Sequence, residues 1–204
     1  MDVTRQPLRS LEPKPGRRER ISPAEYAILG LLVVVPEEAG MHGYDLGRRF
    51  HDGPLSEIIR LEPGMLYHYL KKLSKAGFLS TSVEHQSTRP DRQDHSLTEE
   101  GQGVFDRWLN APVHATRDIR LDFLLKLFFV RQIDTEWAHT LVRTQRAVIA
   151  SLVDSLTRQR EVHGDDPEDH GIRRIVLDLR VAQTEAVLGW LDALPEASVP
   201  SPSS

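Results

Sequence analysis

The chain of 204 residues contains no cysteine. Disulfide bonds, thiolate zinc sites and catalysis by a cysteine nucleophile are therefore excluded, and the composition suits a reducing compartment. The longest apolar run, from Ala27 to Val35, is far shorter than the roughly 20 residues that a membrane span needs. The first residues carry Arg and Pro without the apolar core of a secretory signal. We therefore expect a cytoplasmic protein.

Motifs for catalysis are missing as well. The sequence has no GxSxG, HExxH, Walker or dinucleotide-binding pattern. An acidic stretch from His163 to His170 could in principle hold a divalent cation, but acid-rich hydrated loops are far more common than metal sites. We expect no enzymatic activity, no cofactor and no metal.

The chain has 26 Lys and Arg residues against 30 Asp and Glu residues, so positive charge can dominate only where basic residues are locally concentrated. The net charge of −4 and the pI near 6.1 argue against a protein that coats nucleic acid through bulk charge. The cations gather instead in residues 1–20, in Lys71, Lys72 and Lys75, and in Arg89 and Arg92. Specific nucleic-acid binding needs only such a local basic face, and its affinity should depend strongly on salt.

The segment from Glu62 to Thr98 has the pattern of a recognition helix followed by a hairpin. At 100° per residue, Leu66, Tyr69, Leu70, Leu73 and Gly77 fall on one face and Gly64, His68 and the three lysines on the other. Pro63 opens this helix and Gly77 closes it. Two strands then run from about Phe78 to His85 and from Arg92 to Leu97, with a loop from Gln86 to Asp91.

Two helices are expected before this segment. Ser22-Pro23-Ala24-Glu25 has the composition of a capping box, and the helix that it starts ends at Pro36. A second helix begins near His42-Gly43, buries Leu46 and Phe50, and ends at Gly53-Pro54. Residues from Ser56 to Arg60 are expected to form a short strand or turn. Three helices and a hairpin make a winged helix-turn-helix.

Helical patterns continue to Leu194. Thr98 should cap a helix with Val104, Phe105, Trp108 and Leu109 on its apolar face. Ile119 to Val130 is apolar on nearly all sides and must be covered. A helix from about Thr135 to Glu161 follows, and Gly164 with Pro167 marks its end. The last helix, from Gly171 to Leu194, carries two apolar flanks, of which one can pack within the subunit and the other against a partner.

The fold class that these patterns predict is mainly α, with an N-terminal winged helix-turn-helix, a two-stranded wing and a helical C-terminal dimerisation domain. We divide the chain into a disordered basic arm (1–20), the DNA-binding domain (21–112), a helical dimerisation and possible effector domain (113–195) and a disordered tail (196–204). The expected dimerisation residues are Ile172, Ile175, Val176, Leu179, Val187, Trp190 and Leu191.

The chain resembles the PadR family of transcriptional regulators, of the larger type with a helical C-terminal domain. The residues that carry the resemblance are Ile28-Leu29-Gly30-Leu31-Leu32, His42-Gly43-Tyr44-Asp45-Leu46, Pro63-Gly64-Met65-Leu66-Tyr67 and Leu97-Thr98-Glu99-Glu100-Gly101 leading to Trp108. Among the departures, His95 stands where an aromatic residue is usual. The resemblance implies a dimeric repressor that binds an inverted repeat and, in many members, releases it when a small aromatic or amphipathic compound binds.

Residue roles follow from the helix pattern and the resemblance. The expected DNA contacts are Tyr44, Gly64, Met65, Tyr67, His68, Lys71, Lys72, Lys75, Arg89 and Arg92. Gly64 lets the helix N-terminus approach a phosphate, and the lysines suit phosphates or base edges. Trp108, Trp137 and Trp190 are candidates for stacking on an aromatic effector, although tryptophans at helical spacing more often belong to a core.

The function expected is a sequence-specific DNA-binding transcriptional regulator, a homodimeric repressor that a small effector releases from a pseudo-palindromic operator on double-stranded DNA. The alternative is a winged-helix module that binds protein partners without sequence-specific DNA binding, which the acidic balance of the chain favours. The two hypotheses differ in their salt dependence, because only DNA binding releases condensed counterions.

Overall fold

The computed structural model describes residues 21–35, 40–84, 92–163 and 171–194. The predicted basic arm, the wing loop with Arg89, the acidic stretch after His163 and the predicted tail lie outside the described residues. The N-terminal half begins with α1 (Pro23–Val33), whose N-cap Ser22 forms the predicted capping box with Glu25. β1 (Met41–His42) and α2 (Gly43–Asp52) follow.

The helix-turn-helix consists of α2 and α3 (Pro63–Lys75), joined by the 3₁₀ turn η1 (Pro54–Glu57) where the sequence left a strand or a turn open. Gly77 has a φ of 80°, a left-handed conformation that glycine adopts without a side-chain clash, and it ends the helix where predicted. The wing consists of β2 (Leu79–Glu84) and β3 (Arg92–Leu97), which pair antiparallel from Leu79↔Leu97 to Glu84↔Arg92.

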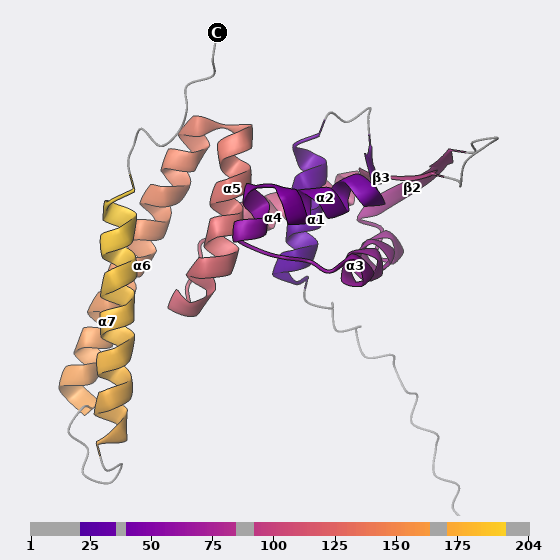
Figure 1. Ribbon diagram of the computed structural model, residues 1–204. Helices are drawn as coiled ribbons and strands as arrows, with labels where there is room; N and C mark the ends of the chain where they lie inside the picture. Colours follow the sequence, from indigo (N-terminus) through magenta and orange to yellow (C-terminus); the bar gives the residue numbers. More distant parts are fainter. Residues whose placement is uncertain (1–20, 36–39, 85–91, 164–170, 195–204) are drawn as a thin grey trace, which may run out of the picture.

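The sheet has a third strand that the sequence analysis missed. β1 pairs antiparallel with the other edge of β3, so that the strand order is β1-β3-β2. Two residues are too short a run to show alternation, and only the pairing Met41↔His95 reveals them as a strand. In Figure 1 the wing projects beyond the helices as the extended end of this sheet.

Every regular element of the C-terminal half is helical among the described residues. It contains α4 (Glu99–Asn110), the 3₁₀ turn η2 (Thr116–Asp118), the π-helical turn η3 (Ile119–Phe123), α5 (Leu124–Ile133), α6 (Thr135–His163) and α7 (Ile172–Asp192). The apolar stretch expected as one helix thus begins with a π-helical turn and continues to Ile133. In Figure 1, α6 and α7 lie side by side, with α5 between them and the winged part.

One core joins the two predicted domains. A cluster of buried residues extends from Ala24 in α1 to Leu191 in α7, across the boundary expected after Pro112. A Cβ on Gly30 of α1 would lie 2.6 Å from ring atoms of Phe129 in α5, so the two helices are in close contact there. Beyond the boundary, Gln145 of α6 holds the backbone of Val113 by accepting from its nitrogen at 2.8 Å and donating to its oxygen at 2.6 Å.

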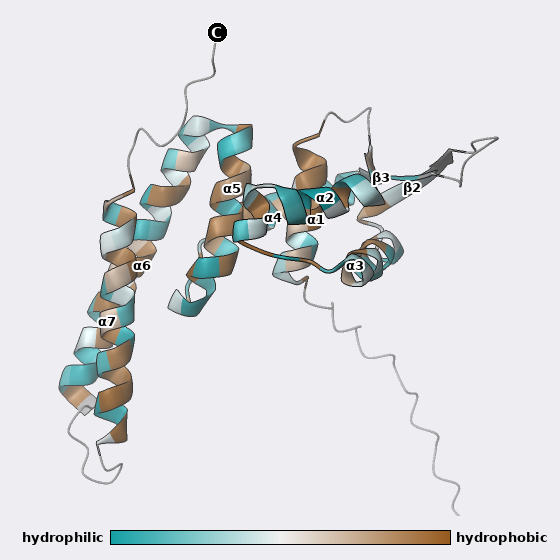
Figure 2. Ribbon diagram, in the orientation of Figure 1, coloured by the Kyte–Doolittle hydropathy of each residue, from teal (hydrophilic) through white to brown (hydrophobic). Residues whose placement is uncertain are grey.

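No helix in the described part of the chain is both long and apolar enough to cross a membrane. Apolar residues, brown in Figure 2, nevertheless recur along the whole of α7. Its buried residues Leu177, Val181 and Leu191 face the rest of the subunit.

Candidate nucleic-acid interface

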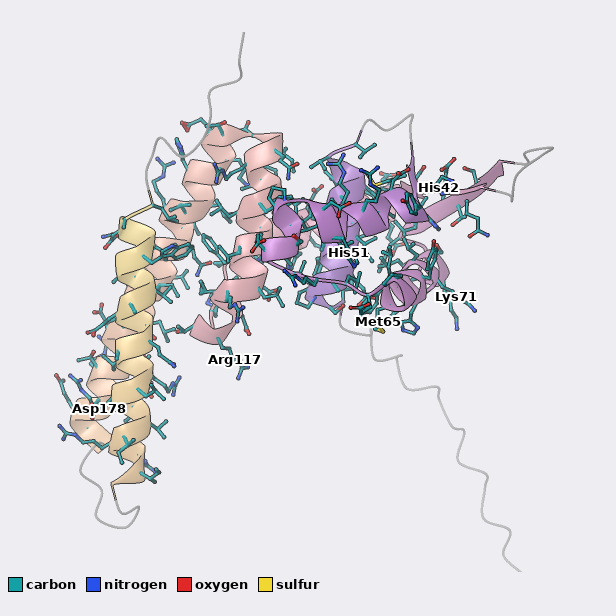
Figure 3. All side chains as sticks on the ribbon, in the orientation of Figure 1. His42, His51, Met65, Lys71, Arg117 and Asp178 are labelled. Carbon is teal, nitrogen blue, oxygen red and sulfur yellow. The ribbon has the colours of Figure 1, made fainter. Side chains whose placement is uncertain are left out.

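Helix α3 has a buried face and an exposed face, as predicted. Leu66, Leu70 and Leu73 are at most 2% exposed and form the back of the helix. Gly64, Met65, Tyr67, His68, Lys71 and Lys75 are all exposed. In Figure 3 the side chains of Met65 and Lys71 extend outward from α3. The structure therefore brings six of the predicted contact residues together on one surface, which we call the α3 front.

The N-terminus of α3 is open. Its N-cap Glu62 makes no side-chain hydrogen bond to the helix, and the first turn contains no acidic residue. A Cβ built on Gly64 meets nothing within 4 Å. The first amides of a helix lack intrahelical partners and carry the positive end of the helix dipole. They can therefore donate hydrogen bonds to an anionic phosphate oxygen.

A groove between α2 and α3 adjoins the α3 front. Its volume is about 250 Å³, and Tyr44 and Tyr67 both line it. Tyr44 is 70% exposed, whereas Tyr67 lies over Gly43, where a Cβ would be 3.0 Å from its Cε1. Glycine at position 43 thus leaves room for the Tyr67 ring. Tyr44 on α2 and Tyr67 on the recognition helix both keep exposed surface, and their contact with DNA remains a prediction.

Arg48 and His51 line the same groove, although neither was predicted as a contact. They follow Tyr44 by four and seven positions in α2, a helical spacing that the sequence already contained. Arg48 lies 3.7 Å from Asp52, and His51 Nδ1 is 3.1 Å from the Gly47 carbonyl oxygen. These residues extend the basic surface beyond the α3 front.

Lys72 differs from the other two lysines. Its Nζ lies 3.2 Å from Oε1 of Glu25, a carboxylate on α1 that is 1% exposed. The Lys72 side chain is itself only 28% exposed. The sequence projection put all three lysines on one front, but the structure turns this one toward α1.

The wing is only partly described. Arg89 lies outside the described residues, and Arg92 is placed only by its backbone in β3. His95 is 6% exposed, and its Nδ1 lies 3.3 Å from Thr81 Oγ1 on the neighbouring strand. Burial lowers the pKa of His95, while the nearby Asp94 acts in the opposite direction. This histidine therefore takes the interior position at which an aromatic residue was expected.

The three tryptophans lie in three different places. Trp108 stacks on Tyr26 with ring centroids 4.5 Å apart, and Lys126 Nζ lies 5.1 Å from its ring centre. Trp137 borders a cavity of about 60 Å³, which is smaller than the ~150 Å³ known to accept benzene. Trp190 is 37% exposed and meets Phe123 edge to face.

Helix α7 presents most of its predicted dimerisation residues to solvent. Ile172, Ile175, Val176, Leu179 and Trp190 are exposed, and Val187 is half-buried. Leu191 is an exception, because it is 2% exposed and belongs to the core of its own subunit. Its assignment to a contact between subunits is therefore corrected. Within the described residues, no group of three or more His, Asp or Glu side chains is arranged to hold a metal ion.

Two family models match the chain. The model of the transcriptional regulator PadR-like family matches residues 31–107, and that of the virulence activator alpha C-terminal region matches residues 119–197. A curated relative, the negative transcriptional regulator PadR of Bacillus subtilis, is 25% identical over 83% of this chain and 94% of its own length.

Several solved structures are similar to this chain in sequence and fold. B. subtilis PadR in complex with operator DNA has 23% identity, covers 87% of this chain and 99% of its own, and gives a TM-score of 0.42. The same protein in complex with p-coumaric acid has 21% identity, covers 85% and 96%, and gives 0.38. A PadR-like transcriptional regulator from Bacillus cereus has 23% identity, covers 87% and 96%, and gives 0.39.

Proposed function

Because this chain belongs to the PadR-like family of transcriptional regulators, we propose that it is a sequence-specific DNA-binding repressor, acting in the cytoplasm as a homodimer that a small effector releases. The observation that carries the proposal is the α3 front, where Met65, His68 and Lys71 stand exposed on a helix backed by buried leucines. A helix of this kind fits the major groove of DNA and reads base edges there.

The surrounding groups suit the phosphate backbone. The open N-terminus of α3 and the adjoining Tyr44, Arg48 and Tyr67 offer donors beside the reading helix. Contacts of this kind fix the register of a protein on DNA, while base contacts supply the sequence preference. The predicted wing contacts through Arg89 and Arg92 extend the same surface along the duplex and remain predictions.

The homodimer part rests on α7. Its exposed apolar residues need a cover, and a second α7 in an isologous contact provides one. A twofold pair of recognition helices reads two half-sites about 34 Å apart, which requires a pseudo-palindromic operator. Repression is supported by the name of the B. subtilis relative, which describes a negative regulator.

The effector part rests on the family resemblance. Trp190 is the best placed of the three candidates, because its ring is partly exposed among the dimerisation residues. Trp108 already contacts Tyr26 and Lys126, and the cavity beside Trp137 must widen before it can hold an aromatic ring. An effector that enters between two subunits at Trp190 would change the spacing of their recognition helices.

DNA binding is tested with the duplex upstream of the gene that encodes this chain and a scrambled duplex of equal length. We expect the protein to prefer the upstream duplex. In the proposed homodimer, Lys71→Met removes one phosphate contact from each of the two subunits. It should therefore weaken binding and reduce the magnitude of the slope of log K against log salt by about 1.8, at about 0.9 for each contact on duplex DNA. Arg158→Met is the matched control, since Arg158 is exposed on α6 and its loss should change neither quantity.

Equal affinity for the two duplexes would instead support the protein-interaction module. Footprinting of the upstream duplex with and without an aromatic acid tests the effector. p-Coumaric acid is a suitable first compound, because it is the acid held by the B. subtilis PadR structure. A footprint that no aromatic acid alters would contradict release by an effector of this class.

A further inference from the structure

A buried carboxylate connects α1 with the recognition helix. Oε2 of Glu25 accepts hydrogen bonds of 2.8 Å from both the backbone nitrogen and the hydroxyl of Ser22. Nζ of Lys72 lies 3.2 Å from Oε1 and 3.4 Å from Oε2 of the same carboxylate. Two residues that are 47 positions apart in the chain are thereby joined.

Because Glu25 is buried, losing its ion pair with Lys72 would cost much free energy. A carboxylate that is 1% exposed has lost its water and needs charged or hydrogen-bonding partners. Ser22 supplies two donors to Oε2, and Lys72 supplies the positive charge and reaches Oε1. Loss of the lysine alone would leave a buried negative charge without its cation, which is much more costly than loss of both partners.

The pair is placed to set the orientation of α3. Helix α1 is anchored in the core by Ala27, Ile28 and Leu29, all of which are 0% exposed. Lys72 lies near the C-terminal end of α3, one residue after Lys71. A bond from this position to a fixed helix restricts rotation of α3 about its axis. That rotation decides which side chains of the α3 front face the DNA.

We propose that Lys72 is a positioning residue for operator recognition, held by Glu25 so that α3 presents Lys71 and Lys75 to the duplex, and that it does not itself contact a phosphate. The inference deepens the proposed function and rests on it. It assigns the three lysines of α3 to two roles, which the helical projection could not separate.

Salt dependence distinguishes the two roles. The experiment measures the affinity of Lys72→Met, Glu25→Gln/Lys72→Met and Lys71→Met for the upstream duplex at several salt concentrations. Methionine keeps the length of the lysine stem, and glutamine keeps an acceptor for the Ser22 donors. The double variant also leaves the net charge unchanged.

We expect the affinity of Lys72→Met for the upstream duplex to fall at least about tenfold. The buried carboxylate of Glu25 then lacks its cation, and α3 lacks its link to α1. The double variant should bind more tightly than Lys72→Met but more weakly than the wild type, because the buried charge is gone while the link from α3 to α1 is still missing. Its salt slope should be unchanged. Lys71→Met should reduce the magnitude of the slope, as the loss of a phosphate contact does.

Two results would overturn the assignment. A double variant that binds as weakly as Lys72→Met, and whose slope is smaller in magnitude by about 1.8, would show that Lys72 contacts a phosphate in each subunit. A wild-type protein that does not distinguish the upstream duplex from the scrambled one would overturn the proposed function and this inference with it. Should Lys72→Met fail to fold, the double variant decides between the roles by itself, since it contains no uncompensated charge.

Discussion

Lys126 shows how far one residue can depart from the pattern around it. In the sequence it interrupts an apolar helix, whereas in the structure its side chain is buried at 3% exposure. Its Nζ donates to the Ala111 carbonyl oxygen and lies over the Trp108 ring, at the junction of α4 and α5. Burial lowers the pKa of Lys126 from 10.5 to about 8, against the opposing effect of Asp122.

The lowered pKa of Lys126 makes stability depend on pH. Between pH 8 and 10.5 the folded chain binds fewer protons at this amine than the unfolded chain, so its free energy of unfolding rises with pH. Relative to Lys126→Met, the wild type should gain roughly 2 kcal/mol between about pH 7 and pH 10. Urea denaturation of both proteins across this range measures the difference. A constant difference would mean that the amine is not perturbed.

Helix α4 illustrates how an element is fixed at its first turn. Thr98 Oγ1 accepts from the Gly101 nitrogen at 3.0 Å and donates to the Gly77 carbonyl oxygen at 2.7 Å, so one hydroxyl both caps α4 and holds the end of α3. Gly101 then passes close to the wing, because a Cβ there would lie 2.2 Å from the Phe78 carbonyl oxygen. Because this oxygen belongs to the backbone, it cannot move aside as the end of a flexible side chain can.

Two glycines of α4 should therefore respond in opposite directions to alanine. Gly101→Ala should lower the free energy of unfolding by about 1–3 kcal/mol, as overpacking against fixed atoms does. Gly103→Ala meets only the flexible end of Arg107, at 3.4 Å, and should be neutral or raise stability by up to about 1 kcal/mol through helix propensity. Urea midpoints measure both, and equal effects would contradict the close approach at Gly101.

At the scale of the whole molecule, α7 has two opposed apolar faces. Leu177, Val181 and Leu191 pack within the subunit, and the exposed residues Ile172, Ile175, Leu179 and Trp190 recur at helical spacing on the other side. α6 covers the first face, as the side-by-side ribbons in Figure 1 indicate. On the second face, Phe123 partly covers Trp190, whereas Ile172, Ile175 and Leu179 stay exposed within the described chain.

A charge on this second face should separate the proposed dimer. Leu179→Glu would place a carboxylate where two copies of α7 meet, so sedimentation analysis should show a shift from dimer to monomer and operator binding should fall with it. Glu185→Lys is the matched control, because Glu185 is exposed on the flank of the same helix. A Leu179→Glu protein that stays dimeric would place the dimer contact elsewhere.

The sequence was sufficient for the features that depend on neighbouring residues. Ser22, Pro63, Gly77 and Thr98 mark helix ends through their own hydrogen bonds and backbone angles, and the structure confirms each of them. The order of helices and wing, and the buried and exposed faces of α3, followed from periodicity in the same way. The predicted fold class is confirmed, whereas the roles of the individual contact residues stay predictions.

Other features were decided by contacts between distant parts of the chain. The partner of Lys72 is 47 residues away, β1 is a strand only because β3 lies beside it, and Leu191 is in the core because α7 folds back along α6. Local propensity and periodicity act over a few residues, so they determine where helices begin and which of their faces are apolar. Which neighbour each face meets depends on packing in three dimensions, and only the tertiary structure decides it.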